Sequence, residues 1–169
     1  INYKMQKYAE EAVSEHLGGY LQKTFDREIR WRSSKPFSND TPSAVVDQLM
    51  SQARKWSDRY RHQRKEGKSH DEIMAQFKEP VRMRVFAWNK KGYADTTMTP
   101  DDSIRYYKSF LRAGFMAVEP TTGHVKAYVG GPNYRYFKYD NVSQGKRQVG
   151  STIKPFLYNR RATIRSNLR

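Results

Sequence analysis

The chain has 169 residues, a net charge of +15 and no cysteine, and 37% of its residues are hydrophobic while 14% are aromatic. This length is sufficient for one domain with a core or for two small ones, and the aromatic content argues against disorder. The absence of cysteine excludes disulfides, cysteine-ligated zinc and a cysteine nucleophile. The histidines are scattered along the chain, so we expect no metal site and no other cofactor.

The strong positive charge favours polyanionic partners such as nucleic acid, anionic lipid headgroups or acidic polymers, without choosing among them. No apolar run approaches the length of a membrane span, and no charged-then-apolar N-terminus indicates a signal peptide. The first residue is Ile1 rather than methionine, so we expect a piece of a longer protein, whose missing part could hold any export signal or membrane anchor.

The first segment of the chain is predicted to be a helix. Its apolar residues recur at three- and four-residue steps, at Met5, Tyr8, Ala9, Ala12, Val13 and Leu17. The pair Gly18-Gly19 is a natural stop, because glycine commonly follows the last periodic residue of a helix. We therefore expect an opening helix within residues 1–22.

Two more helices and a strand are predicted in the middle of the chain. Thr41 and Pro42 supply a cap and a first-turn proline for a helix over 42–60. One apolar stripe runs along it, formed by Val45, Val46, Leu49, Met50, Ala53, Trp56 and Tyr60. A capping box begins a short helix over 69–77, and the alternating segment VRMRVFAW predicts a strand over 81–88.

A helix and a β-hairpin are predicted in the next part of the chain. The sequence Thr-Pro-Asp-Asp at 99–102 is a helix start. After Gly114, the segments GFMAVEP and HVKAYVGG have the character of two short strands, and the turn PTTG between them places glycine at its last position. The fold class is therefore predicted to be α+β.

The stretch KRQVGSTIKPF, residues 146–156, places Ser151 three residues before Lys154. A chain of this length contains about one Ser-x-x-Lys match by chance, and this chain has a second match at Ser143 and Lys146. A serine nucleophile requires a base within hydrogen-bond reach and a site for the developing oxyanion. Ser-x-x-Lys meets the first requirement in a helix, because residues three apart lie on one face.

The surrounding residues distinguish the two matches. Gly150 permits close approach of a substrate, and a helix that begins at Ser151 directs backbone N–H groups toward an anion. Ser143 lies in NVSQGKR, with a glycine inside the motif and no apolar residue between serine and lysine. From geometry alone, an ordinary helix start remains the competing interpretation of Ser151.

The run AVEPTTGHVKAYVGGPNYRYFKYDNVSQGKRQVGSTIKPFLY resembles the nucleophile region of class A penicillin-binding proteins. That family has a strand, a D-P-x-T-G-like turn, a second strand ending V-G-G, and then R-Q-x-G-S-x-x-K-P-F. Residues 119–123, 129–131 and 147–156 match these parts in order, with Val149 where many relatives carry proline. The opening INYKMQKYAEEAV is also similar to the start of the family's transpeptidase region, at Gln6, Ala9, Glu10 and Ala12.

The resemblance implies part of a serine transpeptidase domain of the penicillin-binding and β-lactamase-like fold, an antiparallel sheet flanked by helices that is incomplete in this chain. In that family Ser151 attacks the D-Ala-D-Ala carbonyl of a peptidoglycan stem peptide, and an amine from a neighbouring strand then accepts the acyl group. Penicillins acylate the same serine. Lys154 is the activating base, the backbone N–H of Ser151 is an oxyanion donor, and Gly150 belongs to the substrate-binding site.

The resemblance also implies partners and a location. The expected partners are stem peptides, the lipid-linked precursor and β-lactam antibiotics, with a membrane anchor upstream of this chain and no nucleic acid. The expected location is extracytoplasmic, on the periplasmic side of the bacterial inner membrane, and the parent protein is expected to carry a glycosyltransferase as well.

Some parts of the family pattern do not occur here. The motifs S-x-N and K-T-G or K-S-G are absent from the 169 residues, so we expect a fragment that is inactive by itself. Residues 23–98 are expected to be an inserted or linker module, and 99–158 to hold the helix, hairpin and nucleophile segment of the transpeptidase domain. Residues 159–169 are a tail of unclear origin.

The basic stretch RKWSDRYRHQRKEGK has two interpretations. The stretch contains seven Lys or Arg residues and only two acidic ones. Trp56 and Tyr60 lie between the basic residues, as in a polyanion-binding surface. The alternative, which we favour, is a helix whose aromatic residues continue the apolar stripe into the core. Two rival functions remain open for the chain: a basic nucleic-acid-binding module with an accidental Ser-x-x-Lys, and a serine β-lactamase or penicillin-sensor relative.

Overall fold

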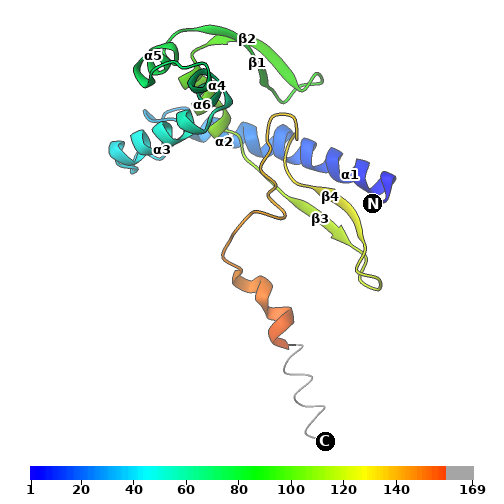
Figure 1. Ribbon diagram of the computed structural model, residues 1–169. Helices are drawn as coiled ribbons and strands as arrows, with labels where there is room; N and C mark the ends of the chain where they lie inside the picture. The colour runs from blue at the N-terminus through cyan, green and yellow to red at the C-terminus, as the bar shows by residue number, and fades with distance from the viewer. Residues whose placement is uncertain (159–169) are drawn as a thin grey trace, which may run out of the picture.

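The computed structural model describes residues 1–158, and the tail over 159–169 lies outside them. A long N-terminal helical rod crosses the molecule, a group of short helices and one hairpin lies on one side of it, and a second hairpin packs against its first turns (Figure 1). The described strands form two separate two-stranded antiparallel sheets, β1–β2 and β3–β4. The predicted α+β class is confirmed, although no single sheet flanked by helices forms within residues 1–158.

The N-terminal rod does not end at the glycine pair. Helix α1 spans Tyr3–Val13, a π-helix η1 continues over Ser14–Leu21, and α2 extends over Gln22–Ile29, with right-handed helical backbone at each junction. The predicted stop at Gly18-Gly19 is therefore wrong. Neither glycine has the positive φ that a glycine helix cap adopts.

Close packing, rather than helix termination, explains the first glycine of the pair. A Cβ atom on Gly18 would lie 2.4 Å from the ring of Trp88, whereas nothing lies within 4 Å of such an atom on Gly19. Farther along the rod, the buried Gln22 side chain donates to the carbonyl of Ser109 (3.0 Å) and accepts from the amide of Leu111 (2.9 Å). The second half of the rod is thus fixed to a segment more than 85 residues later in the chain.

The α3–α6 module, residues 43–108, contains four helices and the first hairpin. Its elements are α3 (Ser43–Trp56), α4 (Asp58–Lys65), α5 (His70–Gln76), β1 (Val81–Phe86), β2 (Tyr93–Met98) and α6 (Pro100–Lys108). The capping box of α5 is confirmed, with Ser69 and Glu72 bonded reciprocally. Strand β1 ends at Phe86, two residues before the predicted end, and the sequence analysis did not identify β2.

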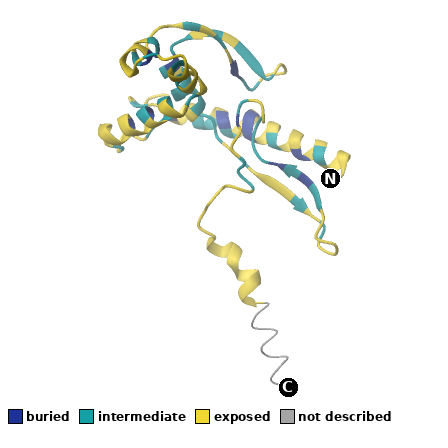
Figure 2. Ribbon diagram, in the orientation of Figure 1, coloured by how far each residue is buried: buried dark blue, intermediate teal, exposed yellow. Residues whose placement is uncertain are grey.

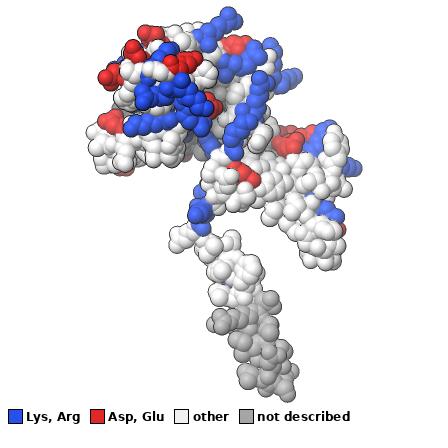
Figure 3. All heavy atoms as spheres, viewed as in Figure 1, with Lys and Arg blue, Asp and Glu red and all other residues white. Residues whose placement is uncertain are grey.

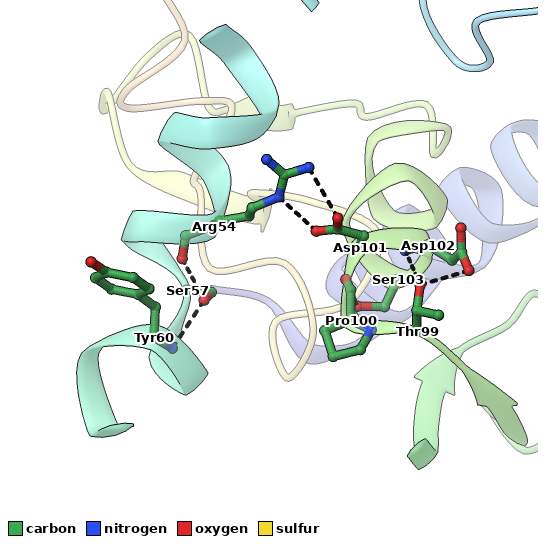
Figure 4. Close-up of polar contacts among 8 residues, drawn as sticks. All are labelled: Arg54, Ser57, Tyr60, Thr99, Pro100, Asp101, Asp102 and Ser103. Atoms are coloured by element: carbon green, nitrogen blue, oxygen red, sulfur yellow. Dashed lines mark hydrogen bonds and ion pairs between the residues drawn. The ribbon is translucent and has the colours of Figure 1, made fainter. Parts of the chain in front are cut away.

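The helix predicted over 42–60 is broken at Ser57. This residue has extended backbone, its hydroxyl donates to the carbonyl of Arg54 (2.6 Å), and it accepts from the amide of Tyr60 (3.2 Å) (Figure 4). The break turns Trp56 into solvent, where 70% of its surface is exposed, so the prediction that it faces the core is wrong. Val46 and Met50 do form the buried stripe of α3.

Helix α6 is fixed to α3 and to β1. The Arg54 guanidinium forms a bidentate ion pair with the Asp101 carboxylate, with N–O distances of 2.7 and 3.0 Å (Figure 4). At the other end of α6, the hydroxyl of Tyr106 donates to the carbonyl of Phe86 (2.7 Å), and the amide of Phe86 donates to the hydroxyl of Tyr107 (3.1 Å). Charged side chains of both signs cover the exposed face of this module, with Lys and Arg in excess (Figure 3).

The second hairpin, β3 (Phe115–Val118) and β4 (Val125–Val129), packs against α1. Ala9 of the helix meets Ala127 and Val129 of the strand in a small buried cluster. The outer edge of β4 is closed by the Gln6 carboxamide, which accepts from the amide of Tyr128 (2.8 Å) and donates to its carbonyl (2.9 Å). Such side-chain pairing protects a strand edge that otherwise exposes unpaired polar groups.

Candidate active site

The Ser-x-x-Lys motif lies on a helical turn, as predicted. A 3₁₀-helix η2 spans Gly150–Ile153, and helical backbone continues through Tyr158. The backbone N–H of Lys154 donates to the carbonyl of Ser151, so the two residues occupy one turn, and residues three apart in a 3₁₀-helix eclipse one another. Gly150 has φ of +51°, a left-handed conformation that a residue with a Cβ atom adopts only with strain.

The nucleophile segment, named for the candidate nucleophile Ser151, comprises residues 146–158. Each of these residues is exposed, and the segment projects away from the rest of the molecule (Figures 1 and 2). Ser151, Lys154 and Gly150 are brought together by the turn alone. Within residues 1–158, neither the Ser151 hydroxyl nor the Lys154 amine has a hydrogen-bond partner. The described part of the chain therefore supplies a candidate nucleophile and a candidate base, but not the buried surroundings that a lysine base requires.

The second Ser-x-x-Lys match has a structural role in the described chain. The hydroxyl of Ser143 donates to Oδ2 of Asp140 at 2.7 Å, and its backbone amide is 3.3 Å from Oδ1 of the same carboxylate. Ser143 thereby closes a tight turn, and no helical turn places Lys146 above it. The structure therefore distinguishes the two matches as their sequence context does: Ser151 and Lys154 share a helical turn, whereas Ser143 and Lys146 do not.

Asp140 is the centre of the hydrogen bonds around this turn. Its carboxylate accepts from the hydroxyl of Tyr128 (2.5 Å) and from the amide of Val142 (2.9 Å), in addition to Ser143. These donors, with the Tyr128 hydroxyl first, lower the pKa of Asp140 to about 2. The same bond to the carboxylate raises the pKa of Tyr128.

The end of strand β4 is shaped to receive this turn. A Cβ atom on Gly130 would lie 2.8 Å from Oδ1 of Asp140, so any larger residue here would force the Asp140 carboxylate to move. Both the amide and the side chain of Asn141 donate to the carbonyl of Gly130, each at 2.8 Å. A Cβ atom on Gly114, the residue before β3, would meet Asn141 and Val142 at about 3 Å, so the turn packs closely against the end of the hairpin where β3 begins and β4 ends.

An aromatic cluster holds the chain between β4 and this turn. The ring of Phe137, which is 3% exposed, lies 5.1 Å from Phe86 and 5.7 Å from each of Tyr107 and Phe110. The Arg112 guanidinium lies 5.0 Å from the same ring. The partners of Phe137 come from the end of β1 and from α6 and the residues after it, so the cluster joins the hairpin loop to the α3–α6 module.

Asp140, Tyr128 and Phe137 were not predicted from the sequence. The spacing Asp140-x-x-Ser143 was a usable signal, because aspartate side chains commonly bond backbone and hydroxyl groups two or three residues later. Phe137 gave no local signal, since its partners lie far away in sequence. Among residues 1–158, no three His, Asp or Glu side chains converge on a position for a metal ion.

Known proteins resemble this chain in two ways. The family model described as the penicillin-binding protein middle domain matches residues 32–111. Penicillin-binding protein 2D of Bacillus subtilis is 50% identical over 50 residues, which are 30% of this chain and 7% of that protein. Penicillin-binding proteins 1A of Vibrio cholerae and Escherichia coli are 49% identical over 45 residues and 42% identical over 48, covering 27% and 28% of this chain and 6% of each relative.

These matches thus span less than a tenth of the length of the curated relatives. No solved structure gives a significant match. Within residues 1–158, no helix combines the length and the apolar character needed to cross a bilayer.

Proposed function

We propose that the chain carries the nucleophile segment of a peptidoglycan D,D-transpeptidase. The matches to penicillin-binding proteins support this proposal. The observation that carries the proposal is the single helical turn that holds Ser151 and Lys154 directly after Gly150. Within the described residues, the other Ser-x-x-Lys pair has neither the helical turn nor a free serine hydroxyl.

In the proposed reaction, the hydroxyl oxygen of Ser151 attacks the D-Ala-D-Ala carbonyl of a stem peptide, and Lys154 accepts the hydroxyl proton. The backbone N–H of Ser151 donates to the oxyanion that forms on the carbonyl oxygen. When the peptide bond breaks, the proton passes to the leaving D-alanine amine and an acyl-serine remains. An amine of a neighbouring strand then takes the acyl group and restores the serine hydroxyl, whereas a penicillin leaves the acyl-serine in place.

The exposure of the nucleophile segment indicates what a longer parent protein must add. The proposal requires the S-x-N and K-T-G motifs, which do not occur in the 169 residues, and groups that bury Lys154, which is exposed within residues 1–158. It also requires a second oxyanion donor. It also includes the expected partners, namely stem peptides, the lipid-linked precursor and β-lactams. An upstream membrane anchor and glycosyltransferase, and a location on the extracytoplasmic side of the membrane, belong to the same proposal.

Labelling of the parent protein by a fluorescent penicillin tests the proposal. We expect Ser151→Ala to abolish covalent labelling, because the attacking oxygen is lost. Ser143→Ala removes the serine of the other Ser-x-x-Lys pair and one donor to Asp140, so we expect it to reach full labelling, at a lower rate than the wild type. Equal labelling of both variants would contradict the assignment of Ser151.

The lifetime of the label separates the related enzyme classes. A transpeptidase is expected to keep the penicilloyl group for a long time, whereas a β-lactamase releases it by rapid hydrolysis. A basic nucleic-acid-binding module, in contrast, is expected to show no covalent labelling at all and to bind an oligonucleotide with an affinity that falls steeply with added salt.

A further inference from the structure

We propose that residues 132–145 form a positioning loop for the nucleophile segment, fixed to the α3–α6 module by Phe137 and to strand β4 by Asp140. Phe137 and Asp140 are positioning residues, because they lie outside the reacting turn and act through the backbone between them and Ser151. The structural part of this inference stands on contacts within the described chain. Its catalytic consequence rests on the proposed function.

The attachment to the module is a buried one. Phe137 is almost completely removed from solvent, and its ring meets Phe86, Tyr107 and Phe110 at the centroid distances of edge-on aromatic packing. Phe86 is itself 2% exposed and is hydrogen-bonded through its backbone to α6. The loop is therefore anchored at a rigid point of the module, where β1 ends and α6 packs.

The attachment to the hairpin is a polar one. Asp140 accepts from Tyr128 on β4 and from two residues of its own turn, and Asn141 adds two hydrogen bonds to the carbonyl of Gly130. The turn also makes close contacts with Gly130 and Gly114 at the end of the hairpin. The chain is held from two directions within four residues, at Phe137 and at Asp140.

The tether from this anchor to the nucleophile is short. Asn141 and Gly145 are in tight contact, because a Cβ atom on Gly145 would lie 2.4 Å from the Asn141 carbonyl oxygen. Residues 146–149 then lead directly into the η2 turn. An extended chain advances at most about 3.6 Å per residue, so the start of η2 lies within about 18 Å of the anchor. The anchor therefore limits where Ser151 can lie relative to any groups that complete the site, and we infer that a shift of the anchor is passed on to Ser151.

Hydrogen exchange and acylation in the full-length parent protein test the inference together. Phe137→Leu leaves a gap in the aromatic cluster, and Asp140→Asn replaces an acceptor oxygen shared by two hydroxyl donors with an amide donor. We expect either change to speed amide exchange across residues 141–156 about 10-fold or more. We expect the rate of penicillin acylation at saturating concentration to fall about 10- to 100-fold, because a displacement near 1 Å is costly in catalysis.

Matched controls separate positioning from general destabilisation. Phe77→Leu makes the same substitution at a site 1% exposed within the α3–α6 module, and Asp95→Asn removes a carboxylate paired with Arg84 on the first hairpin. Both controls are expected to leave exchange over 141–156 and the acylation rate unchanged. Tyr128→Phe removes one hydroxyl donor to Asp140 and is expected to leave a protein that folds. We expect it to speed exchange and slow acylation less than Asp140→Asn does.

Each outcome decides one of the two proposals. Unchanged exchange over 141–156 in Phe137→Leu, Asp140→Asn and Tyr128→Phe would overturn the positioning loop. Acylation of these variants at the wild-type rate, with the wild-type protein acylated at Ser151, would overturn it equally. Faster exchange in the variants, together with a wild-type protein that penicillin does not label, would uphold the positioning loop and reject the transpeptidase.

Discussion

Asp140 illustrates how one ordinary polar residue determines local geometry. Aspartate is common in loops, and its type alone predicts only a turn. Here the carboxylate takes donors from β4 and from the residues after it, which lowers its pKa to about 2. Its contacts depend on Tyr128, which lies on β4, and on Gly130, which follows that strand.

The pH dependence of stability tests this carboxylate. Because the pKa of Asp140 is lowered from 3.8 to about 2 by folding, its stabilisation is present above pH 3.8 and is lost as the pH falls through about 2. We expect the difference in unfolding free energy between the wild-type parent protein and Asp140→Asn to be constant from pH 7 to about pH 5. It should shrink toward pH 2. Urea denaturation at several pH values measures it, and a difference that stays constant down to pH 2 would contradict the assignment.

At the scale of single elements, the N-terminal rod shows local preference overruled by packing. Glycine disfavours a helix interior by about 1 kcal/mol relative to alanine, and two glycines in succession predict a helix end. The rod nevertheless continues to Ile29, because Trp88 lies against Gly18 and Gln22 is bonded to the end of α6. The reverse occurs at Ser57, where a polar side chain ends a helix that the apolar stripe alone predicts to continue.

The two adjacent glycines are expected to respond oppositely to alanine. Gly18→Ala forces a methyl group into the Trp88 ring and should destabilise the parent protein by about 1–3 kcal/mol. Gly19→Ala places its methyl group in open space in a helical conformation and should stabilise by up to about 1 kcal/mol. Thermal or chemical denaturation of the two variants measures the contrast. A similar cost at both positions would show that Trp88 does not pack on the rod.

At the scale of the whole molecule, three contact regions join distant parts of the chain. Helix α1 covers β4, Gln22 fixes the rod to the end of α6, and Phe137 attaches the loop after β4 to the α3–α6 module. The nucleophile segment follows all three regions in the chain. Within residues 1–158, no hydrogen bond or ion pair connects it to a distant part of the chain. Placement of the segment therefore depends on the loop before it and on protein outside the described residues.

The isolated 169-residue chain is expected to give no stoichiometric labelling with a fluorescent penicillin. Ser151 and Lys154 are exposed, and the chain lacks the S-x-N and K-T-G motifs. Circular dichroism establishes whether the isolated chain retains its helices, and the parent protein, labelled in parallel, serves as the positive control. Full labelling of a folded isolated chain would show that the described residues already form a sufficient site.

Much of the secondary structure could be predicted from local patterns. The capping box at Ser69, the helix start at Thr99 and the hairpin turn ending at Gly123 are confirmed, because each depends on residues within a few positions of one another. Strand β2 escaped prediction because the sequence YADTTM has few apolar residues, and it is defined by its register with β1. Trp56 was assigned to the core because periodicity does not reveal that Ser57 breaks the helix.

The sequence by itself determined the α+β class, most element positions, and the turn that places Ser151 beside Lys154 after a glycine. These features depend on periodicity, capping and spacing, which act over a few residues. Only the tertiary structure decided which glycine is required for packing, that Trp56 is exposed, and which distant residues Phe137 and Asp140 contact before the turn that holds Ser151. Those features depend on contacts between residues distant in sequence, and no local pattern records which residues the fold brings together.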